Sequence, residues 1–256
     1  MPSYVVESLV LNRTDLGEHD RVLTLYSRGL GKIAAIAKGA RKGKSRLSGG
    51  SEIFTQAKLQ LATGRSFDII TQCEIENNFT SLRTNLQFLA RATYFCELLN
   101  RFTGDRDASS SQELFELTVR ALGWLQNSQV YVDAVVHAYE IQLLQTLGYS
   151  PVLDRCVVCG VALGKSGAGF SASLGGVVCP ADRFRASDAL PLSNEAALAL
   201  VLLQTEGAES ILALNPSKAA IREIAATLRS FIRYRADRSL KSADFLEQLR
   251  ASDQHS

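Results

Sequence analysis

Residues 55–61 read Thr55-Gln56-Ala57-Lys58-Leu59-Gln60-Leu61, and this stretch decides how the first part of the chain folds. Its apolar side chains alternate strictly with polar ones. Successive side chains of a β-strand point to opposite faces, so the alternation predicts a strand with one buried face and one solvated face. A helix would instead repeat its apolar residues every three or four positions. We therefore expect this part of the chain to be built from strands.

Other short segments around this stretch also have the composition of β-strands. They lie at residues 5–11, 22–26, 32–37 and 67–75, and turn residues such as those at 63–66 separate them. Short strands joined in this way are typical of a small closed barrel such as the OB-fold. The fold class predicted is α+β and multidomain, with an OB-fold barrel first and helices after it.

The connection between the third and fourth predicted strands is strongly basic. Five cations lie within residues 38–46, and no Asp or Glu occurs from residue 21 to residue 51. The whole chain has a net charge of only +2, so positive charge is concentrated locally. Cations that contact phosphates release condensed counterions, which makes this loop suited to a nucleic acid. The alternative is an ordinary solvated loop. The candidate nucleic-acid-binding residues are Lys32, Lys38, Arg41, Lys42, Lys44 and Arg46.

Aromatic side chains that could stack on bases are few in the barrel region. The candidates are Tyr4, Tyr26, Phe54 and Phe67, and we expect several of them to fill the barrel core. Contacts to the sugar-phosphate backbone should then dominate over base stacking. Binding is therefore expected to be independent of base sequence.

Helical periodicity replaces the strand pattern after Asn77. Apolar residues recur at helical spacing from Leu82 to Leu99, with Thr80 or Ser81 available as N-cap. Ser110 and Glu113 predict a capping box for a second helix that ends near residue 125. Further helices are predicted at residues 130–147, at 196–204 with Ser193 as N-cap, and from residue 218 onward. Their apolar stripes indicate a helical core.

Three cysteines and an aspartate have the spacing of a metal site. Cys156 and Cys159 form a tight pair, and Cys179 follows at the distance of a glycine-rich hairpin. Asp182 stands where a fourth cysteine would complete a zinc ribbon. In a reducing cytosol this spacing favours metal over disulfides, so these four residues are the candidate ligands of a Zn²⁺ cofactor. The alternative is an eroded site that keeps the fold without metal.

The sequence gives no support for an enzyme. Two Gly-Lys-Ser sequences, at residues 43–45 and 164–166, lack the glycine spacing of a phosphate-binding loop. The histidines, His19, His137 and His255, form no metal-binding pair. No motif combines a nucleophile, a base and an oxyanion donor.

The remaining features point to a cytoplasmic protein. The first residues lack the basic and apolar regions of a signal peptide. The longest apolar run, residues 196–203, is too short to cross a bilayer, so we expect no membrane association. Cys73 and Cys96 are expected to be plain core residues.

Several segments together resemble one protein family. They are the opening strand, the turn at residues 18–21, Gly31-Lys32 with residues 37–41, residues 147–151 leading into the cysteine pair, and residues 240–246. In this order and spacing the chain resembles RecO, the family of bacterial recombination mediators in DNA repair, over nearly its full length. The resemblance implies an OB-fold domain at residues 1–78, a helical domain at 79–150 and 187–256, and a zinc-ribbon-like insert at 151–186.

The resemblance also implies a function and partners. Such a protein binds single- and double-stranded DNA and anneals complementary strands. It joins RecR and the C-terminal tail of single-strand-binding protein, so that RecA loads onto coated DNA. The family's DNA-binding face maps onto the basic loop and its metal ligands onto Cys156, Cys159 and Cys179, whereas Asp182 departs from the four-cysteine form.

Two other functions fit part of the pattern. An OB-fold with a zinc ribbon also suits a module that binds structured RNA, and competition between DNA and RNA would separate the two. A metal-dependent nucleic-acid hydrolase is the third reading. Three thiolate ligands are typical of a structural metal rather than a catalytic one, which disfavours it.

Overall fold

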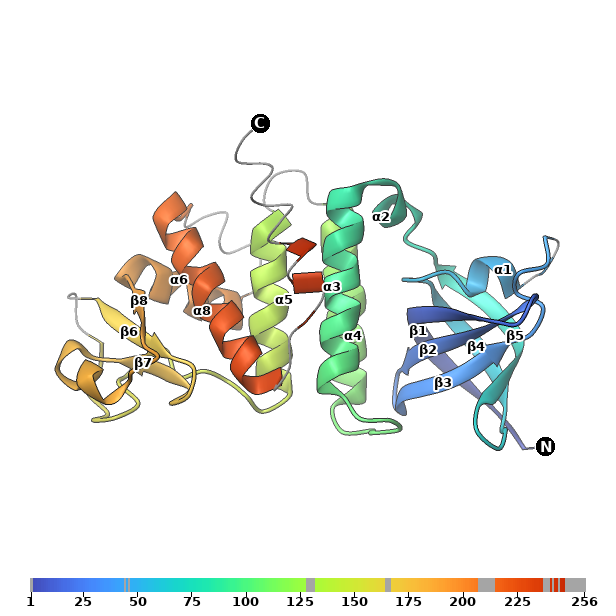
Figure 1. Cartoon of the computed structure of the whole chain (residues 1–256), viewed down its shortest axis with the longest axis horizontal. Helices are drawn as coiled ribbons and strands as arrows, with labels where there is room; N and C mark the ends of the chain where they lie inside the picture. Colours follow the sequence, from blue (N-terminus) through green and yellow to red (C-terminus); the bar gives the residue numbers. More distant parts are fainter. Residues whose placement is uncertain are drawn as a thin grey trace. The chain divides into compact units, whose positions relative to one another are not determined.

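The chain folds into two compact units. The computed structural model describes residues 2–43, 45, 47–127, 132–163, 167–206, 215–236, 240, 242–243 and 245–246 (Figure 1). Its internal contacts divide the chain into unit 1, residues 1–127 with 240–256, and unit 2, residues 128–239. Among the described residues, no helix is both long and apolar enough to span a membrane.

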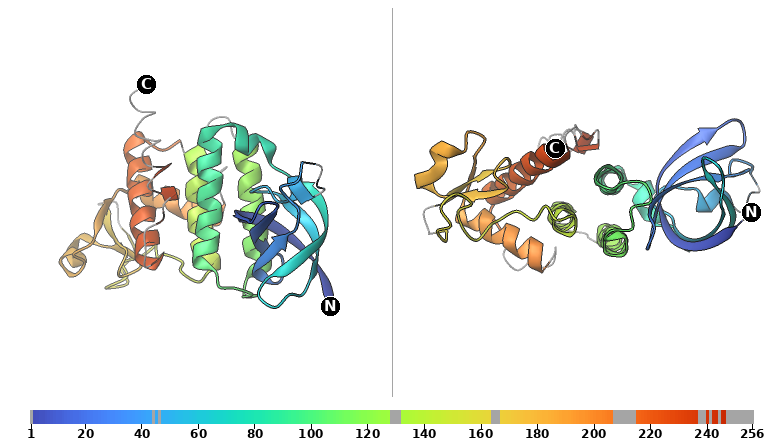
Figure 2. Two further views of the ribbon diagram at one scale, coloured as in Figure 1. Left: turned by 45° about the vertical axis from the view of Figure 1, so that its right-hand side comes forward. Right: turned by 90° about the horizontal axis from the view of Figure 1, so that it is seen from below.

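Unit 1 begins with a five-stranded closed barrel, as predicted. Its strand order is β1-β2-β3-β5-β4, and the right-hand view of Figure 2 shows the strands curving into a ring. Antiparallel pairs make up most of the barrel, and a short parallel pairing of β3 with β5 closes it. A one-turn helix, α1 (Leu47–Gly50), precedes β4. The strands are β1 (Ser3–Leu16), β2 (Asp20–Ser27), β3 (Gly31–Ala37), β4 (Gln56–Ala62) and β5 (Asp68–Asn77).

The barrel interior contains the apolar face that the alternating stretch predicted. Ala57, Leu59 and Leu61 are buried, whereas Lys58 between them is exposed. They pack against Leu23, Leu25, Val6, Ile33 and Ile70 from the other strands. Each fully buried leucine contributes about 1.5–3 kcal/mol relative to an exposed one, so this shared interior stabilises the barrel.

The first strand is longer than predicted because it serves two partners. Its first half pairs with β4, from Ser3 opposite Ala62 onward, and its second half pairs with β2 as far as Leu16 opposite Asp20. A bulge between Val10 and Asn12 marks the change in register. Bulges bend a strand and increase its twist, which allows one strand to close both sides of a small barrel.

Asp68, the first residue of β5, joins three separate segments through one buried carboxylate. Tyr4 Oη of β1 donates to Asp68 Oδ2 at 2.5 Å, and Gly64 N of the β4–β5 loop donates to Oδ1 at 3.1 Å. Arg106, from the segment that follows α3, forms an ion pair with Oδ2. Burial alone would raise the pKa of Asp68, but these hydrogen bonds and the charge of Arg106 outweigh it and lower the pKa.

Three helices of unit 1 follow the barrel: α2 (Thr80–Thr84), α3 (Leu86–Phe102) and α4 (Ser111–Asn127). The prediction of one helix across residues 80–99 was wrong, because Asn85 has an extended backbone and interrupts it. The Asn85 side chain accepts from Gln87 N at 2.8 Å and starts α3 as an N-cap. Ser110 has φ of 51°, outside the extended range of an N-cap, so the predicted capping box has no matching backbone at this position.

Barrel and helices of unit 1 meet at the start of β3. Arg106 N donates to Lys32 O at 2.8 Å, and Lys32 forms a bridge with Asp105. Gly31 has φ of 69°, and a Cβ there would lie 2.0 Å from the Asp107 carbonyl oxygen. Only glycine allows this approach. Arg28 adds ion pairs to Glu7 of the barrel and Glu116 of α4.

Unit 2 packs helices against a small sheet of order β7-β6-β8. Phe170 of β6 and Phe231 of α8 meet edge to face, with ring centroids 5.6 Å apart. Ser193 caps α6 through Ala196 N, and Gly148 after α5 has φ of 81°, both as predicted. The elements are α5 (Val132–Thr146), β6 (Ala168–Ser171), β7 (Gly176–Val178), the 3₁₀ helix η1 (Pro180–Arg185), β8 (Leu190–Leu192), α6 (Asn194–Thr205) and α8 (Lys218–Ala236).

The Asp68 carboxylate should make unit 1 sensitive to acid. Because the folded-state pKa is lower than in the unfolded chain, its stabilisation is complete above about pH 4 and is lost as the pH falls through the lowered value. Asp68→Asn should lower the free energy of unfolding at pH 7 by about 1–3 kcal/mol and weaken its acid dependence. Denaturant unfolding at pH 7 and pH 3 measures the free energy of unfolding and its dependence on pH. Glu18→Gln, at a side chain that is 92% exposed, is the matched control and should change neither value.

Candidate functional site

The described part of the basic loop is anchored to the turn between β1 and β2. Gly39 N donates to Asp20 Oδ1 at 2.7 Å, and Arg41 N donates to His19 O at 2.9 Å. Lys42 N donates to Gly39 O at 3.0 Å within the loop. Gly39 has φ of 66°, a conformation that favours glycine. The loop backbone is thus held in a defined turn, and its cationic side chains project from it.

The predicted nucleic-acid-binding cations differ in their surroundings. Lys38 and Lys42 are exposed. Arg41 is also exposed, and its guanidinium donates to Gly17 O at 3.0 Å and lies 3.5 Å from Asp15. Exposed pairs of this kind contribute little energy, so a phosphate can replace the carboxylate. Lys44 and Arg46 lie outside the described residues.

Lys32 has a different environment from the loop cations. Its side chain is only 15% exposed, and Nζ donates to Asn100 O at 3.0 Å and to Thr103 O at 2.8 Å. These carbonyls lie at the C-terminal end of α3, where a cation is stabilised by the helix dipole. Asp105 is 3.5 Å away. The ammonium of Lys32 therefore joins β3 to the helices of unit 1.

Three glutamates on β1 and β5 surround the neighbouring strand β4. Lys58 of β4 pairs across the sheet with Glu7 of β1 and Glu74 of β5, and Gln56 donates to Glu7 and Glu76. Burial, and then the charge of Glu7, raise the pKa of Glu76. The negative charges of these glutamates repel a polyanion such as a nucleic acid. The carboxylates on β1 and β5 therefore disfavour an anionic ligand at this part of the barrel.

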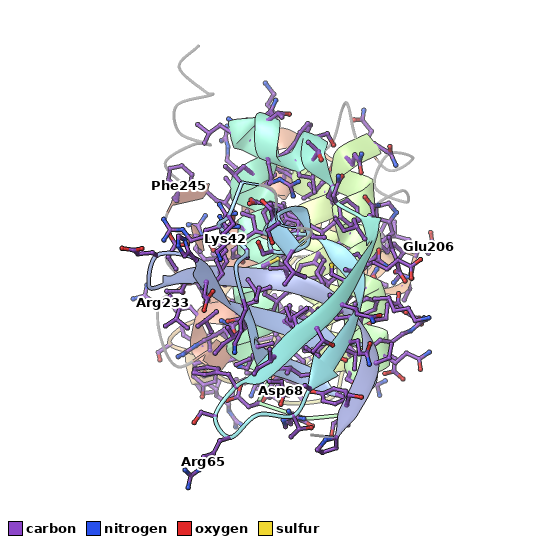
Figure 3. The ribbon with its side chains drawn as sticks, turned by 90° about the vertical axis from the view of Figure 1, so that its right-hand side faces the viewer. Lys42, Arg65, Asp68, Glu206, Arg233 and Phe245 are labelled. Carbon is purple, nitrogen blue, oxygen red and sulfur yellow. The ribbon has the colours of Figure 1, made fainter. Side chains whose placement is uncertain are left out.

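The β4–β5 loop carries two groups that the charge pattern did not single out. Arg65 is exposed and points outward from the loop, beyond Asp68 at the start of β5 (Figure 3). Phe67 is 40% exposed, whereas Tyr26 and Phe54 are fully buried and Tyr4 is bonded to Asp68. Of the four aromatic candidates, Phe67 is the most exposed, and Tyr4 is half-buried. Sequence could have found this loop, because OB-folds bind ligands with the loop between strands four and five.

The cysteine pair forms the expected knuckle in unit 2. Gly160 N donates to Cys156 O at 2.9 Å, and Val158 N points at Cys156 Sγ at 3.4 Å. Cys179 follows β7 directly, and Asp182 lies in η1. Hairpin and knuckle thus bring together residues that are far apart in sequence.

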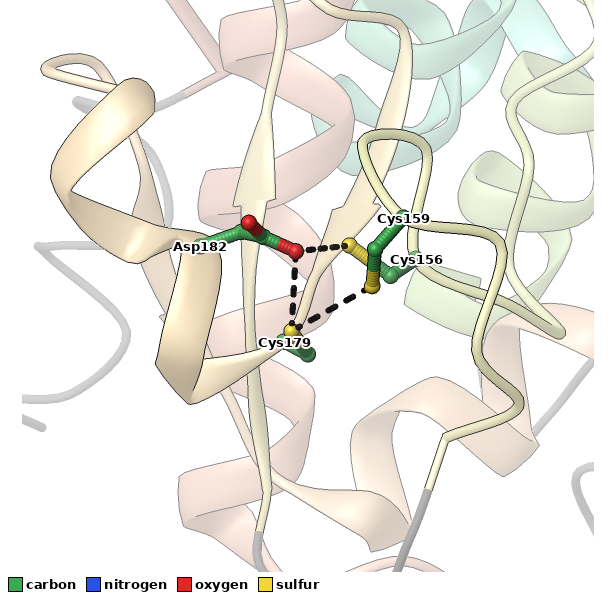
Figure 4. A group of neighbouring side chains, drawn as sticks. All are labelled: Cys156, Cys159, Cys179 and Asp182. Carbon is green, nitrogen blue, oxygen red and sulfur yellow. Dashed lines mark hydrogen bonds between the residues drawn. The ribbon is translucent and has the colours of Figure 1, made fainter.

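The four predicted metal-ligating residues converge on one point (Figure 4). Their ligand atoms all lie within 4.8 Å of one another. The sulfurs of Cys159 and Cys179 are 3.8 Å apart, and Asp182 Oδ2 lies 3.5 Å from Cys156 Sγ and 3.3 Å from Cys179 Sγ. The cluster is close enough to bind a metal ion.

The surroundings of this thiol cluster set its proton affinities. Burial alone would raise the pKa of Cys156, but backbone N–H groups of Cys179, Cys159 and Val158 outweigh it and lower the pKa. The Asp182 carboxylate raises the pKa of the Cys159 thiol to about 12. Thiols that donate to Asp182 lower its own pKa. A metal ion bound by this donor set would displace thiol protons.

Comparisons with known proteins give matches across both units. The family described as "Recombination protein O N terminal" matches residues 1–79, and that described as "Recombination protein O C terminal" matches residues 83–244. A protein named DNA repair protein RecO from Roseiflexus sp. is 36% identical over 254 residues, which cover 96% of this chain and 86% of the relative. Proteins of the same name from Symbiobacterium thermophilum and Pelotomaculum thermopropionicum are 32% and 34% identical. They cover 98% and 97% of this chain, and 100% and 95% of each relative.

The position of Lys32 predicts that its replacement weakens the fold more than binding. Lys32→Met should lower the free energy of unfolding of unit 1 by about 1 kcal/mol, because two helix-end carbonyls lose their donor. The dependence of single-stranded DNA affinity on salt should stay unchanged. Lys42→Met, at an exposed position, should do the opposite and reduce the salt slope by about 0.7. A drop in slope for Lys32→Met as large as for Lys42→Met would contradict this assignment.

Proposed function

Because this chain belongs to the RecO family of DNA repair proteins, we propose that it is a DNA-binding recombination mediator that makes and breaks no covalent bond. It binds single- and double-stranded DNA and anneals complementary strands. With RecR it helps to load RecA onto DNA coated by single-strand-binding protein, whose C-terminal tail it contacts. This work takes place in the bacterial cytoplasm, at the nucleoid during repair.

The observation that supports this function is a cationic loop fixed on a closed barrel. Lys38, Lys42 and Arg41 are exposed beside the turn between β1 and β2. Lys44 and Arg46 continue the same loop in sequence. Glu7, Glu74 and Glu76 lie around β4, whereas the loop carries three exposed cations, with Asp15 and Asp20 at its base.

Annealing follows from charge neutralisation. Two complementary strands repel each other through their phosphates, and this repulsion contributes to the barrier for pairing. Lys and Arg side chains that hold both strands reduce the repulsion and raise the local concentration of each strand. The chain's cations thus speed the encounter, and base pairing between the strands supplies the sequence specificity.

Zinc is the metal that best fits the thiol cluster. A Zn–S distance of about 2.3 Å places the sulfurs of a tetrahedral site about 3.8 Å apart, and the Cys159–Cys179 separation is 3.8 Å. Cys156, Cys159, Cys179 and Asp182 would hold the ion. Four protein ligands leave no open coordination position, so the ion would stabilise the knuckle and hairpin of unit 2 rather than act in catalysis.

The loop cations should determine both DNA affinity and annealing. If about five phosphates are engaged on a single strand, log K should fall with log salt at a slope near −3.5. Replacing Lys38, Arg41, Lys42, Lys44 and Arg46 with Gln should flatten the slope and abolish strand annealing while the barrel stays folded. Fluorescence anisotropy with an oligonucleotide at several salt concentrations measures the slope. A fluorescence assay of duplex formation, with and without coating protein, measures annealing.

Two controls make this experiment decisive. Lys58→Gln removes a cation from the acidic face of the barrel and should leave slope and annealing unchanged. Structured RNA of matched sequence serves as competitor, since an RNA-binding module would prefer it to DNA. A wild-type slope near zero, or preference for RNA, would refute the proposed function.

The proposed zinc site predicts a metal content and an order of affinities. The purified chain should contain one zinc ion, and zinc at about 100 times its Kd should add about 2.7 kcal/mol of stability to unit 2. Asp182→Ala should weaken zinc binding, whereas Asp182→Cys should strengthen it, because thiolate is a softer ligand than carboxylate. Elemental analysis and thermal unfolding with and without chelator test this. Cys73→Ala, in the barrel, is the control and should change neither the zinc content nor the effect of the chelator on thermal unfolding. Equal zinc content in Asp182→Ala and wild type would exclude Asp182 as a ligand.

A further inference from the structure

The outer side of η1 carries an unusually exposed aromatic ring between two arginines. Phe184 is 80% exposed, more than any other large apolar side chain among the described residues. Arg183 and Arg185 on either side of it are also exposed. The Arg185 guanidinium lies 5.4 Å from the Phe184 ring centroid, within the range of a cation–π contact. The fold gains little from burial of this ring, which leaves the ring accessible to a ligand.

Acidic residues near this ring are turned toward other partners. The Asp182 carboxylate points into the thiol cluster (Figure 4). Asp188 accepts from Ser171 Oγ at 2.6 Å and from Ser173 N at 2.9 Å. Hydrogen bonds from the Cys159 and Cys179 thiols, and after them the charge of Arg185, lower the pKa of Asp182. No carboxylate of the described residues lies within ion-pair distance of Arg183 or Arg185. The exposed side of η1 is therefore apolar at its centre and positive on both flanks.

The backbone under this ring is held in place. Pro180 fixes the first turn of η1, and Ala186 N closes its end on Arg183 O at 3.1 Å. Asp182 contacts Cys156 and Cys179 contacts Cys159, so both residues tie the same turn to the cysteine knuckle. A ligand that binds at Phe184 therefore does not have to order the backbone of this turn.

We propose that Arg183, Phe184 and Arg185 form a stacking site for single-stranded nucleic acid, in which a base packs on the Phe184 ring and the arginines contact the flanking phosphates. This inference rests on the proposed DNA-binding function and adds to it a second contact in unit 2, outside the basic loop. The ligand is a strand with unpaired bases, because a base inside a duplex has no free face for the ring.

Shape favours a nucleic acid over an acidic peptide. A peptide with apolar residues buries them in a concave pocket, whereas Phe184 projects from the surface. A projecting ring can stack on a planar base, and its neighbours match the alternation of base and phosphate along a strand. The site adds an exposed ring to the single one, Phe67, among the four aromatic candidates of the barrel.

The test compares an oligothymidylate with an abasic oligomer of the same length and charge. Phe184→Ala should lower affinity for oligothymidylate about 10-fold, and leave affinity for the abasic chain and for duplex DNA unchanged. Leu198→Ala, at an exposed apolar side chain of α6 in the same unit, is the matched control and should change none of them. Phe184→Trp should retain affinity, and its fluorescence should be quenched by oligothymidylate but not by the abasic chain.

The outcomes separate this site from the proposed function. If wild type binds oligothymidylate with a steep salt slope but Phe184→Ala binds it equally well, the stacking site is excluded and the loop-based function stands. Equal losses on the abasic chain, or no quenching in Phe184→Trp, would also overturn the site. If wild type binds no single-stranded DNA, the proposed function itself fails. Displacement of a bound acidic peptide without any effect on DNA would assign the ring to a protein partner instead.

Discussion

The organisation of unit 1 depends on one buried carboxylate, that of Asp68. It receives the Tyr4 hydroxyl from the first strand, the Gly64 amide from the β4–β5 loop and the Arg106 guanidinium from the segment after α3. Asp68 also begins the strand whose parallel pairing with β3 closes the barrel. A buried charge without partners would be strongly unfavourable, so all three segments are held in one arrangement. The position of the Arg65–Phe67 loop follows from this single acceptor.

Charge is distributed unevenly over the small barrel. Glu7, Glu74 and Glu76 lie on one set of strands, and Lys38 and Lys42 project from the loop that follows β3. A chain with near-neutral total charge can still present a local positive field, because the field at contact distance is set by the nearest groups and screened within about 8–10 Å. The net charge of the chain therefore says little about its ligand, and the distribution says much.

Much of the barrel could be predicted from sequence because its signal is local. The period-two alternation at residues 57–61 and the glycine turns report directly on each strand, and the cysteine spacing reports on the knuckle. Other features depend on distant partners. Asn85 interrupts a helical pattern because its side chain caps the start of α3. Lys32 binds carbonyl groups at the end of α3 and does not project with the loop cations. The exposure of Phe184 could not be predicted from sequence either, because residue spacing does not tell which side of a short 3₁₀ turn faces solvent.

The chain returns to unit 1 after completing unit 2. Ser242 N donates to Glu97 Oε2 of α3 at 2.8 Å, across a separation of 145 residues, and Leu240 and Leu246 are buried in the same unit. During synthesis on the ribosome, the barrel and α3 emerge long before residues 240–246 do. Unit 2 lies between them in the chain, so it is translated in full before the segment that contacts the α3 surface around Glu97 is made. Unit 1 is thus begun first and finished last, and its final packing step follows the translation of every other described element.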